Sequence, residues 1–175
     1  RTEDAARDGS LTPGQSERWL AASFDANAMQ ALNETLRLQL RGDIDMAALQ
    51  RALQQVCERH DAFATAFDID APLQGVGVAR TVPVLHDLRA NADPQRAADA
   101  LLEAQRQARF VLDQAPLLNI DLLWLEDQHV IVHLVANHLV FDGWASSVWL
   151  RELATSYHAF ARGQLPALPP AGSAI

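Results

Sequence analysis

The sequence predicts an α/β fold in which a mixed β-sheet is flanked by helices. Helical and strand patterns alternate along the chain, and the strand patterns at residues 117–125 and 129–137 are separated only by the tight turn Asp127-Gln128. The 175 residues suit one domain or lobe. Hydrophobic residues make up 49% of the chain and charged residues 21%, so there are enough apolar side chains to form a core.

Four segments with helical spacing of apolar residues begin at a capping residue. Thr12 precedes Pro13, which suits a first helical turn, and Asp45, Asp93 and Asp142 stand at the other starts. The predicted helices run from these caps to about residues 22, 60, 109 and 162, and the last is closed by Gly163.

Alternation of apolar and polar residues predicts strands at residues 32–41 and 63–67. Residues 73–79 and 82–86 are weaker strand patterns, interrupted by polar or proline breaks. The strand at 129–137 is apolar on both faces, which is typical of a central strand.

Composition excludes several classes of protein. A net charge of −8 and a pI of about 5.1 argue against nucleic acid and anionic membrane surfaces as partners, since both require a basic face. No apolar run is long enough to cross a bilayer, and there is no signal-peptide core. The single cysteine, Cys57, cannot form an internal disulfide and is interpreted as a small buried hydrophobe. We expect a cytoplasmic enzyme or binding module.

The chemistry-bearing segment follows the apolar strand. His138 stands at the carboxyl end of that strand, where α/β proteins place reactive groups, and imidazole exchanges protons near neutral pH. Asp142 could cap the next helix or pair with a cation, and the Gly143 N–H at the helix start could donate to a developing oxyanion.

Other interpretations of this segment stay open on spacing alone. His138 could be a hydrogen-bonded histidine at a strand end and Asp142 a plain helix cap. A metal site built from His129, His133 and His138 would need ligands from both faces of one strand, so we expect no metal.

Four segments together resemble the condensation domains of nonribosomal peptide synthetases. Residues 138–144 (HLVFDGW) match the second half of the HHxxxDGW signature, and residues 11–19 (LTPGQSERW) resemble the family's first motif. Residues 58–67 (ERHDAFATAF) resemble RHExLRTxF, and residues 110–117 (FVLDQAPL) resemble an FDL…PL segment. Four matches in the same order are far more specific than one histidine motif.

The resemblance implies a chloramphenicol-acetyltransferase-like two-layer sandwich, present here as one lobe only. Residues 1–10 are then a flexible tail, residues 11–163 the N-terminal lobe, and residues 164–175 an extended linker toward a missing C-terminal lobe. The family's tunnel lies between the two lobes, so residues 1–175 alone are expected to be incomplete and inactive.

The resemblance also implies roles for individual residues. His138 would take a proton from the attacking amine or hold the amine in position, and the Gly143 N–H would stabilise the oxyanion. Asn137, Asp142 and Trp144 would be structural residues of the same site.

Two positions depart from the family pattern. Asn137 stands where the signature has its first histidine. Ala64 stands where the second motif has the arginine that usually pairs with Asp142. Either Arg59 or another cation substitutes as a structural residue at the site, or the loop is held differently.

The implied reaction transfers an acyl or peptidyl thioester from one carrier protein to the amine of an amino acid on a second, forming an amide. Substrates would arrive on phosphopantetheine arms, with no cofactor bound directly. The expected partners are the donor and acceptor peptidyl carrier proteins, the chain's own C-terminal lobe and neighbouring synthetase domains of an antibiotic pathway. The alternatives are an ester-forming or epimerisation relative, and a non-catalytic module that binds carrier or tailoring proteins.

Overall fold

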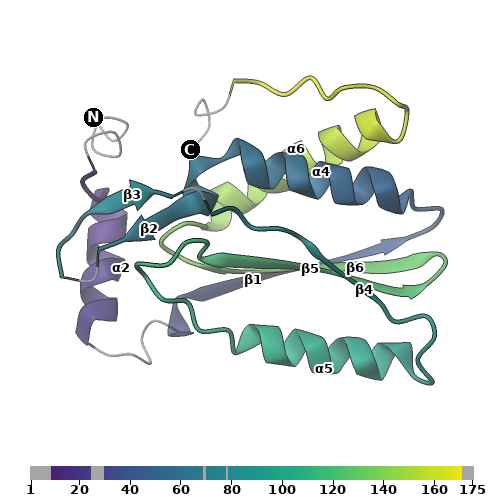
Figure 1. The fold of residues 1–175 in the computed structure, drawn as a ribbon, viewed down its shortest axis with the longest axis horizontal. Helices are drawn as coiled ribbons and strands as arrows, with labels where there is room; N and C mark the ends of the chain where they lie inside the picture. Colours follow the sequence, from purple (N-terminus) through teal and green to yellow (C-terminus); the bar gives the residue numbers. More distant parts are fainter. Residues whose placement is uncertain (1–8, 25–29, 69, 78, 171–175) are drawn as a thin grey trace.

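The structure is a computed structural model that describes residues 9–24, 30–68, 70–77 and 79–170 (Figure 1). Its elements are α2 (Pro13–Phe24), β1 (Asn33–Arg41), α4 (Met46–Arg59), the 3-10 helix η1 (Asp61–Ala64), β2 (Thr65–Phe67), β3 (Gln74–Val76), β4 (Val84–Asp87), α5 (Pro94–Arg106), β5 (Leu118–Glu126), β6 (His129–Asn137) and α6 (Gly143–Phe160).

A four-stranded mixed sheet organises the fold. Its strand order is β1-β6-β5-β4, and β2 and β3 form a separate two-stranded sheet. β6 pairs antiparallel with both β1 and β5, whereas β4 pairs parallel with β5. The predicted α/β class with a mixed sheet is confirmed.

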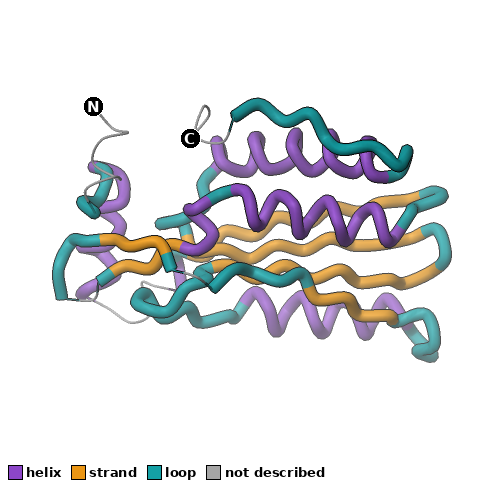
Figure 2. Tube along the Cα trace, turned by 45° about the horizontal axis from the view of Figure 1, so that its top comes forward, coloured by secondary structure: helices purple, strands orange, loops and turns teal. Residues whose placement is uncertain are grey.

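Helices lie on both faces of this sheet. α4 and α6 lie together over one face, and α5 lies against the other (Figures 1 and 2). All nine residues of β6 are buried, as its apolar character on both faces predicted. Full burial of one such side chain, Leu134, contributes about 2 kcal/mol relative to an exposed position.

Two apolar clusters fill the two sides of the sheet. The larger lies between the sheet and helices α4 and α6 and contains Leu53, Leu134 and Trp149. The smaller lies under α5 and joins Ala98 to Leu123 and Ile131. Among the described residues no helix is long and apolar enough to cross a membrane.

The predicted helix caps are confirmed. Asp45, Asp93 and Asp142 each accept a hydrogen bond from the backbone N–H three residues further on, at 2.9, 2.9 and 2.8 Å. α5 ends at Arg106, earlier than the predicted residue 109, and Gly163 has the positive φ of 68° expected after a helix.

The strand predicted at residues 63–67 is wrong in its first half. Residues Asp61–Ala64 form a 3-10 turn, in which the Phe63 N–H donates to the His60 carbonyl at 3.1 Å. Phe63 and Phe67 are both buried. The alternation of apolar residues therefore predicted burial correctly, although it did not predict the backbone conformation of residues 63 and 64. β3 and β4 are present but shorter than, or shifted from, the predicted ranges.

The predicted tails lie partly outside the described residues. Residues 1–8 and 171–175 are not described, whereas Ser10 forms an antiparallel bridge with Leu73, next to β3. The Gln74 N–H donates to the Gly9 carbonyl at 2.8 Å. Residues 164–170 contain no helix or strand and pass back along α6 (Figure 1).

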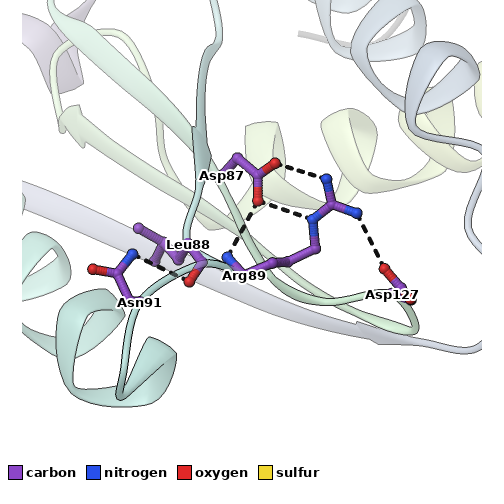
Figure 3. A network of polar contacts seen from close by, with 5 residues as sticks. All are labelled: Asp87, Leu88, Arg89, Asn91 and Asp127. Carbon is purple, nitrogen blue, oxygen red and sulfur yellow. Dashed lines mark hydrogen bonds and ion pairs between the residues drawn. The ribbon is translucent and has the colours of Figure 1, made fainter.

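An exposed arginine joins β4 to the β5–β6 turn (Figure 3). Arg89 donates to both carboxylate oxygens of Asp87 and, at 3.1 Å, to Asp127 in the turn. Its guanidinium also lies 3.5 Å from the centre of the Trp124 ring. The hydrogen bonds from Arg89 lower the pKa of Asp87 to about 2. This cluster lies at the opposite end of β6 from His138.

Candidate functional site

The carboxyl end of β6 positions His138. Its backbone N–H donates to the Leu32 carbonyl at 2.8 Å, and its side chain is 25% exposed although the strand before it is buried. Nδ1 lies 3.1 Å from the Phe141 carbonyl oxygen. A carbonyl can only accept, so Nδ1 carries a hydrogen, and whenever the ring is neutral Nε2 is the nitrogen with the lone pair.

Two charged side chains from distant parts of the chain flank Nε2. The Nη2 atom of Arg18, on α2, lies 3.5 Å from it, and Oε1 of Glu34, on β1, lies 3.4 Å from it. The ring nitrogen able to take a proton therefore lies between a guanidinium donor and a carboxylate acceptor.

Asn137 shapes the turn that carries His138. Its side chain is fully buried, and Oδ1 accepts a hydrogen bond from the Leu139 N–H at 3.1 Å. Its carbonyl accepts from the N–H groups of Val140 and Phe141, at 3.0 and 3.2 Å. An asparagine side chain commonly accepts a hydrogen bond from the backbone N–H two residues further on. Asn137, which stands in place of the family's first histidine, therefore has a structural role in this turn.

Asp142 and Gly143 form the start of α6. Oδ1 of Asp142 accepts from the Ala145 N–H at 2.8 Å, and among the described residues no ion pair involves this carboxylate. The capping alternative is therefore the one that the structure supports. A Cβ placed on Gly143 would meet no atom within 4 Å, so the helix start, with its outward N–H groups, faces open space.

The first motif reaches the His138 loop through Gln15. Its Nε2 donates to the Leu139 carbonyl at 3.1 Å. Its Oε1 accepts from the Thr12 N–H at 3.0 Å while Thr12 Oγ1 accepts from the Gln15 N–H at 3.3 Å, which is a capping box. α2 is thus fastened to the loop by the residue that also caps it.

Arg59 does not take the role expected of it beside Asp142. Its Nε lies 3.2 Å from Oε2 of Glu152 on α6, and His60 Nε2 lies 2.7 Å from the same oxygen. Glu152 and His60 are both buried. Arg59 is held by Glu152 because α4 and α6 pack side by side, whereas Asp142 lies at the solvent-facing start of α6.

The remaining candidate residues lie in different surroundings. Trp144 is 66% exposed at the start of α6. His129 and His133 are buried, and burial lowers the pKa of each. Among the described residues no group of histidine, cysteine and carboxylate side chains could hold a metal ion. Burial raises the pKa of the Cys57 thiol to about 12, which makes it a poor nucleophile.

Sequence reasoning missed Glu34 and Glu152. Glu34 lies about a hundred positions before His138, and only the register that places it opposite Ala136 brings it to the site. Glu152 had a visible signal, because it interrupts the apolar face formed by Val148, Trp149 and Leu153. A carboxylate at such a position predicts a buried partner, although not which one.

Comparison with known proteins agrees with this geometry. The profile of the condensation domain family matches residues 6–173. The chain is 34% identical over 155 residues to chondramide synthase cmdD of Chondromyces crocatus, covering 86% of this chain and 4% of that protein. It is 33% identical over 174 residues to phosphinothricin tripeptide synthetase PhsB of Streptomyces viridochromogenes, covering 95% of this chain and 14% of that protein.

Solved structures of similar fold are condensation domains. The starter condensation domain of rhizomide synthetase RzmA matches with a TM-score of 0.77 and 30% identity, over 92% of this chain and 40% of that one. VibH, a condensation enzyme, matches with a TM-score of 0.84 over 90% of this chain and 37% of that one, at 20% identity. The fold is therefore of the chloramphenicol-acetyltransferase-like class. The chain belongs to the condensation domain family of nonribosomal peptide synthetases.

Proposed function

We propose that this chain is the N-terminal lobe of a condensation domain that joins a carrier-bound acyl or peptidyl group to the amine of a second carrier-bound amino acid. Residues 11–163 form the lobe, and residues 164–175 lead toward a C-terminal lobe. The chain spans 14% or less of the two curated relatives and about two fifths of the solved domains described above, which agrees with one lobe of a larger assembly.

The observation that carries this proposal is the orientation of His138. The Phe141 carbonyl fixes a hydrogen on Nδ1, which leaves Nε2 as the nitrogen that can accept a proton, on a side chain that is 25% exposed. The start of α6, where Gly143 faces open space, lies five residues further on. A base and a set of backbone donors at one edge of the lobe are the two elements that acyl transfer requires.

The reaction follows from these groups. The amine nitrogen attacks the carbonyl carbon of the donor thioester, a C–N bond forms, and the negative charge that develops on oxygen is stabilised by the Gly143 N–H. Collapse breaks the C–S bond and releases the phosphopantetheine thiolate. His138 Nε2 accepts the proton lost by the nitrogen, or holds the amine in line, and the proton passes to the leaving sulfur.

Substrates and partners follow from the same proposal. Both substrates arrive on phosphopantetheine arms, so the lobe binds donor and acceptor carrier proteins and its own C-terminal lobe, and needs no cofactor of its own. We place the assembly in the cytoplasm. The second candidate function is a non-catalytic module, and the observation in its favour is Asn137 in place of the family histidine. The catalytic function is preferred because Asn137 supports the turn through the Leu139 N–H, while the backbone contact of the His138 ring is made by Nδ1 and not by Nε2.

The test is His138→Ala in a two-lobe domain that contains this chain, with both carriers loaded. Loss of a general base lowers turnover by about 10²–10⁴-fold, and we expect a fall in that range, measured by mass spectrometry of the condensed product. His158→Ala, an exposed histidine near the end of α6, is the matched control and should leave turnover unchanged. Undiminished condensation by His138→Ala would refute the catalytic role.

A further inference from the structure

Glu34 places a carboxylate beside the reactive nitrogen of His138. Its Oε1 lies 3.4 Å from Nε2, and its side chain is 49% exposed. The residue lies on β1 opposite Ala136, next to the end of β6, so the strand pairing itself fixes its backbone at the site. No element of the proposed mechanism uses this carboxylate.

The two nucleophiles open to this family differ in how many hydrogens they present. A neutral primary amine has two N–H groups, so when one is directed to Nε2 the other needs a hydrogen-bond acceptor. An alcohol has a single O–H, which Nε2 alone satisfies. A second acceptor atom beside Nε2 is therefore useful to an amine and of no use to an alcohol, whose remaining oxygen lone pairs it repels.

Glu34 is the group suited to supply that second acceptor. Arg18 also lies near Nε2, at 3.5 Å, but a guanidinium only donates. The Phe141 carbonyl is directed at Nδ1, on the other side of the ring. Because the Glu34 side chain is half exposed and has three rotatable bonds, its carboxylate can turn aside to admit a nitrogen between itself and Nε2.

We infer that Glu34 binds the amino group of the incoming nucleophile beside His138 and makes the site select an amine over a hydroxyl. This inference rests on the proposed function, because it assumes that His138 receives the nucleophile. It deepens that function by naming the side chain that selects a primary amine as the nucleophile. A site that hydrogen-bonds an N–H of its substrate discriminates more strongly against an analogue without that N–H than a site that selects by shape alone.

The experiment is a competition within one reaction. A two-lobe domain that contains this chain and a loaded donor carrier is given equal amounts of two thioester nucleophiles, an α-amino acid and the matching α-hydroxy acid. The amide-to-ester ratio is measured for the unmodified protein, Glu34→Gln, Glu34→Asp and the control Glu17→Gln, which removes an exposed carboxylate from α2. The ratio does not depend on the fraction of folded protein, since both products form on the same molecules.

We expect Glu34→Gln to lower the amide-to-ester ratio about two- to fivefold, because the amide oxygen still accepts a hydrogen bond but lacks the charge that strengthens it. The KM for the amine should rise while kcat changes little, Glu34→Asp should fall between the two, and Glu17→Gln should leave the ratio unchanged. An unchanged ratio in Glu34→Gln, or the same fall in Glu17→Gln, overturns the inference. His138→Ala separates the two proposals: if it abolishes both products while Glu34→Gln keeps the ratio, only the role of Glu34 is wrong.

Discussion

The buried carboxylate of Glu152 offers the most direct test of how α4 and α6 are held together. It accepts from His60 at 2.7 Å and pairs with Arg59 at 3.2 Å, and the Arg59 and Glu152 side chains are only 15% and 5% exposed. Glu152→Ala would leave the arginine and the histidine of α4 without their carboxylate. Nη2 of Arg59 is already buried without a hydrogen-bond partner among the described residues, so it has no alternative acceptor in place.

The expected loss of stability follows from that burial. Removing one partner of a buried pair costs about 3–5 kcal/mol, because the other charge remains desolvated and uncompensated. For a chain of this length each kcal/mol lowers the melting temperature by about 2–4 °C. Glu152→Ala should therefore melt roughly 6–20 °C lower, measured by circular dichroism, with a matching fall in the urea midpoint.

Two further variants make this prediction refutable. Arg151→Ala removes an exposed charge from the neighbouring position of α6 and should change stability by about 0.5 kcal/mol or less. Replacing Arg59, His60 and Glu152 together by apolar residues of similar volume should restore most of the loss, since no buried charge remains. A folded Glu152→Ala protein within about 1 kcal/mol of the original would refute the reasoning.

Two other predictions concern the cap and the sheet. Asp142→Ala should cost about 1 kcal/mol in urea unfolding because the Ala145 N–H loses its acceptor, while Asp142→Asn should keep most of that stability; equal losses would indicate a charge-pairing role instead. Burial lowers the pKa of His133 in the folded state, so below its unfolded pKa of about 6.5 the unfolded chain binds a proton that the folded chain does not, and stability falls as the pH drops. His133→Leu should flatten this decline between about pH 6.5 and 5, leaving the share of His129; a slope identical to that of the original protein would contradict the assignment.

Much of the fold was predictable because it depends on local signals. The aspartates before three helices and the doubly apolar run of β6 act within a few residues, and the structure confirms each of them. The position of His138 followed from the end of that run. Apolar alternation can reflect burial without an extended backbone. At residues 63–67 it predicted the buried side chains correctly, but the backbone is extended only from Thr65 onward.

The contacts around His138 were less predictable because they cross long stretches of sequence. Glu34 reaches the ring through strand register, and Arg18 reaches it through the packing of α2, neither of which composition or periodicity encodes. Arg59 was expected beside Asp142 as a substitute for the family arginine, but it pairs with Glu152 on the buried face of α6. The sequence shows which charged side chains need a partner if they are buried, and the tertiary fold determines which of the possible partners lies within reach.

The bond from Gln15 to the Leu139 carbonyl bears on where members of this family can be recombined. The helix that carries Gln15 precedes the whole sheet, yet this amide supports the turn next to His138. A chimera whose crossover falls between α2 and β1 would combine an amide from one parent with a turn from another. Such crossovers should succeed when both parents have glutamine at this position, and otherwise the junction is better placed before residue 11.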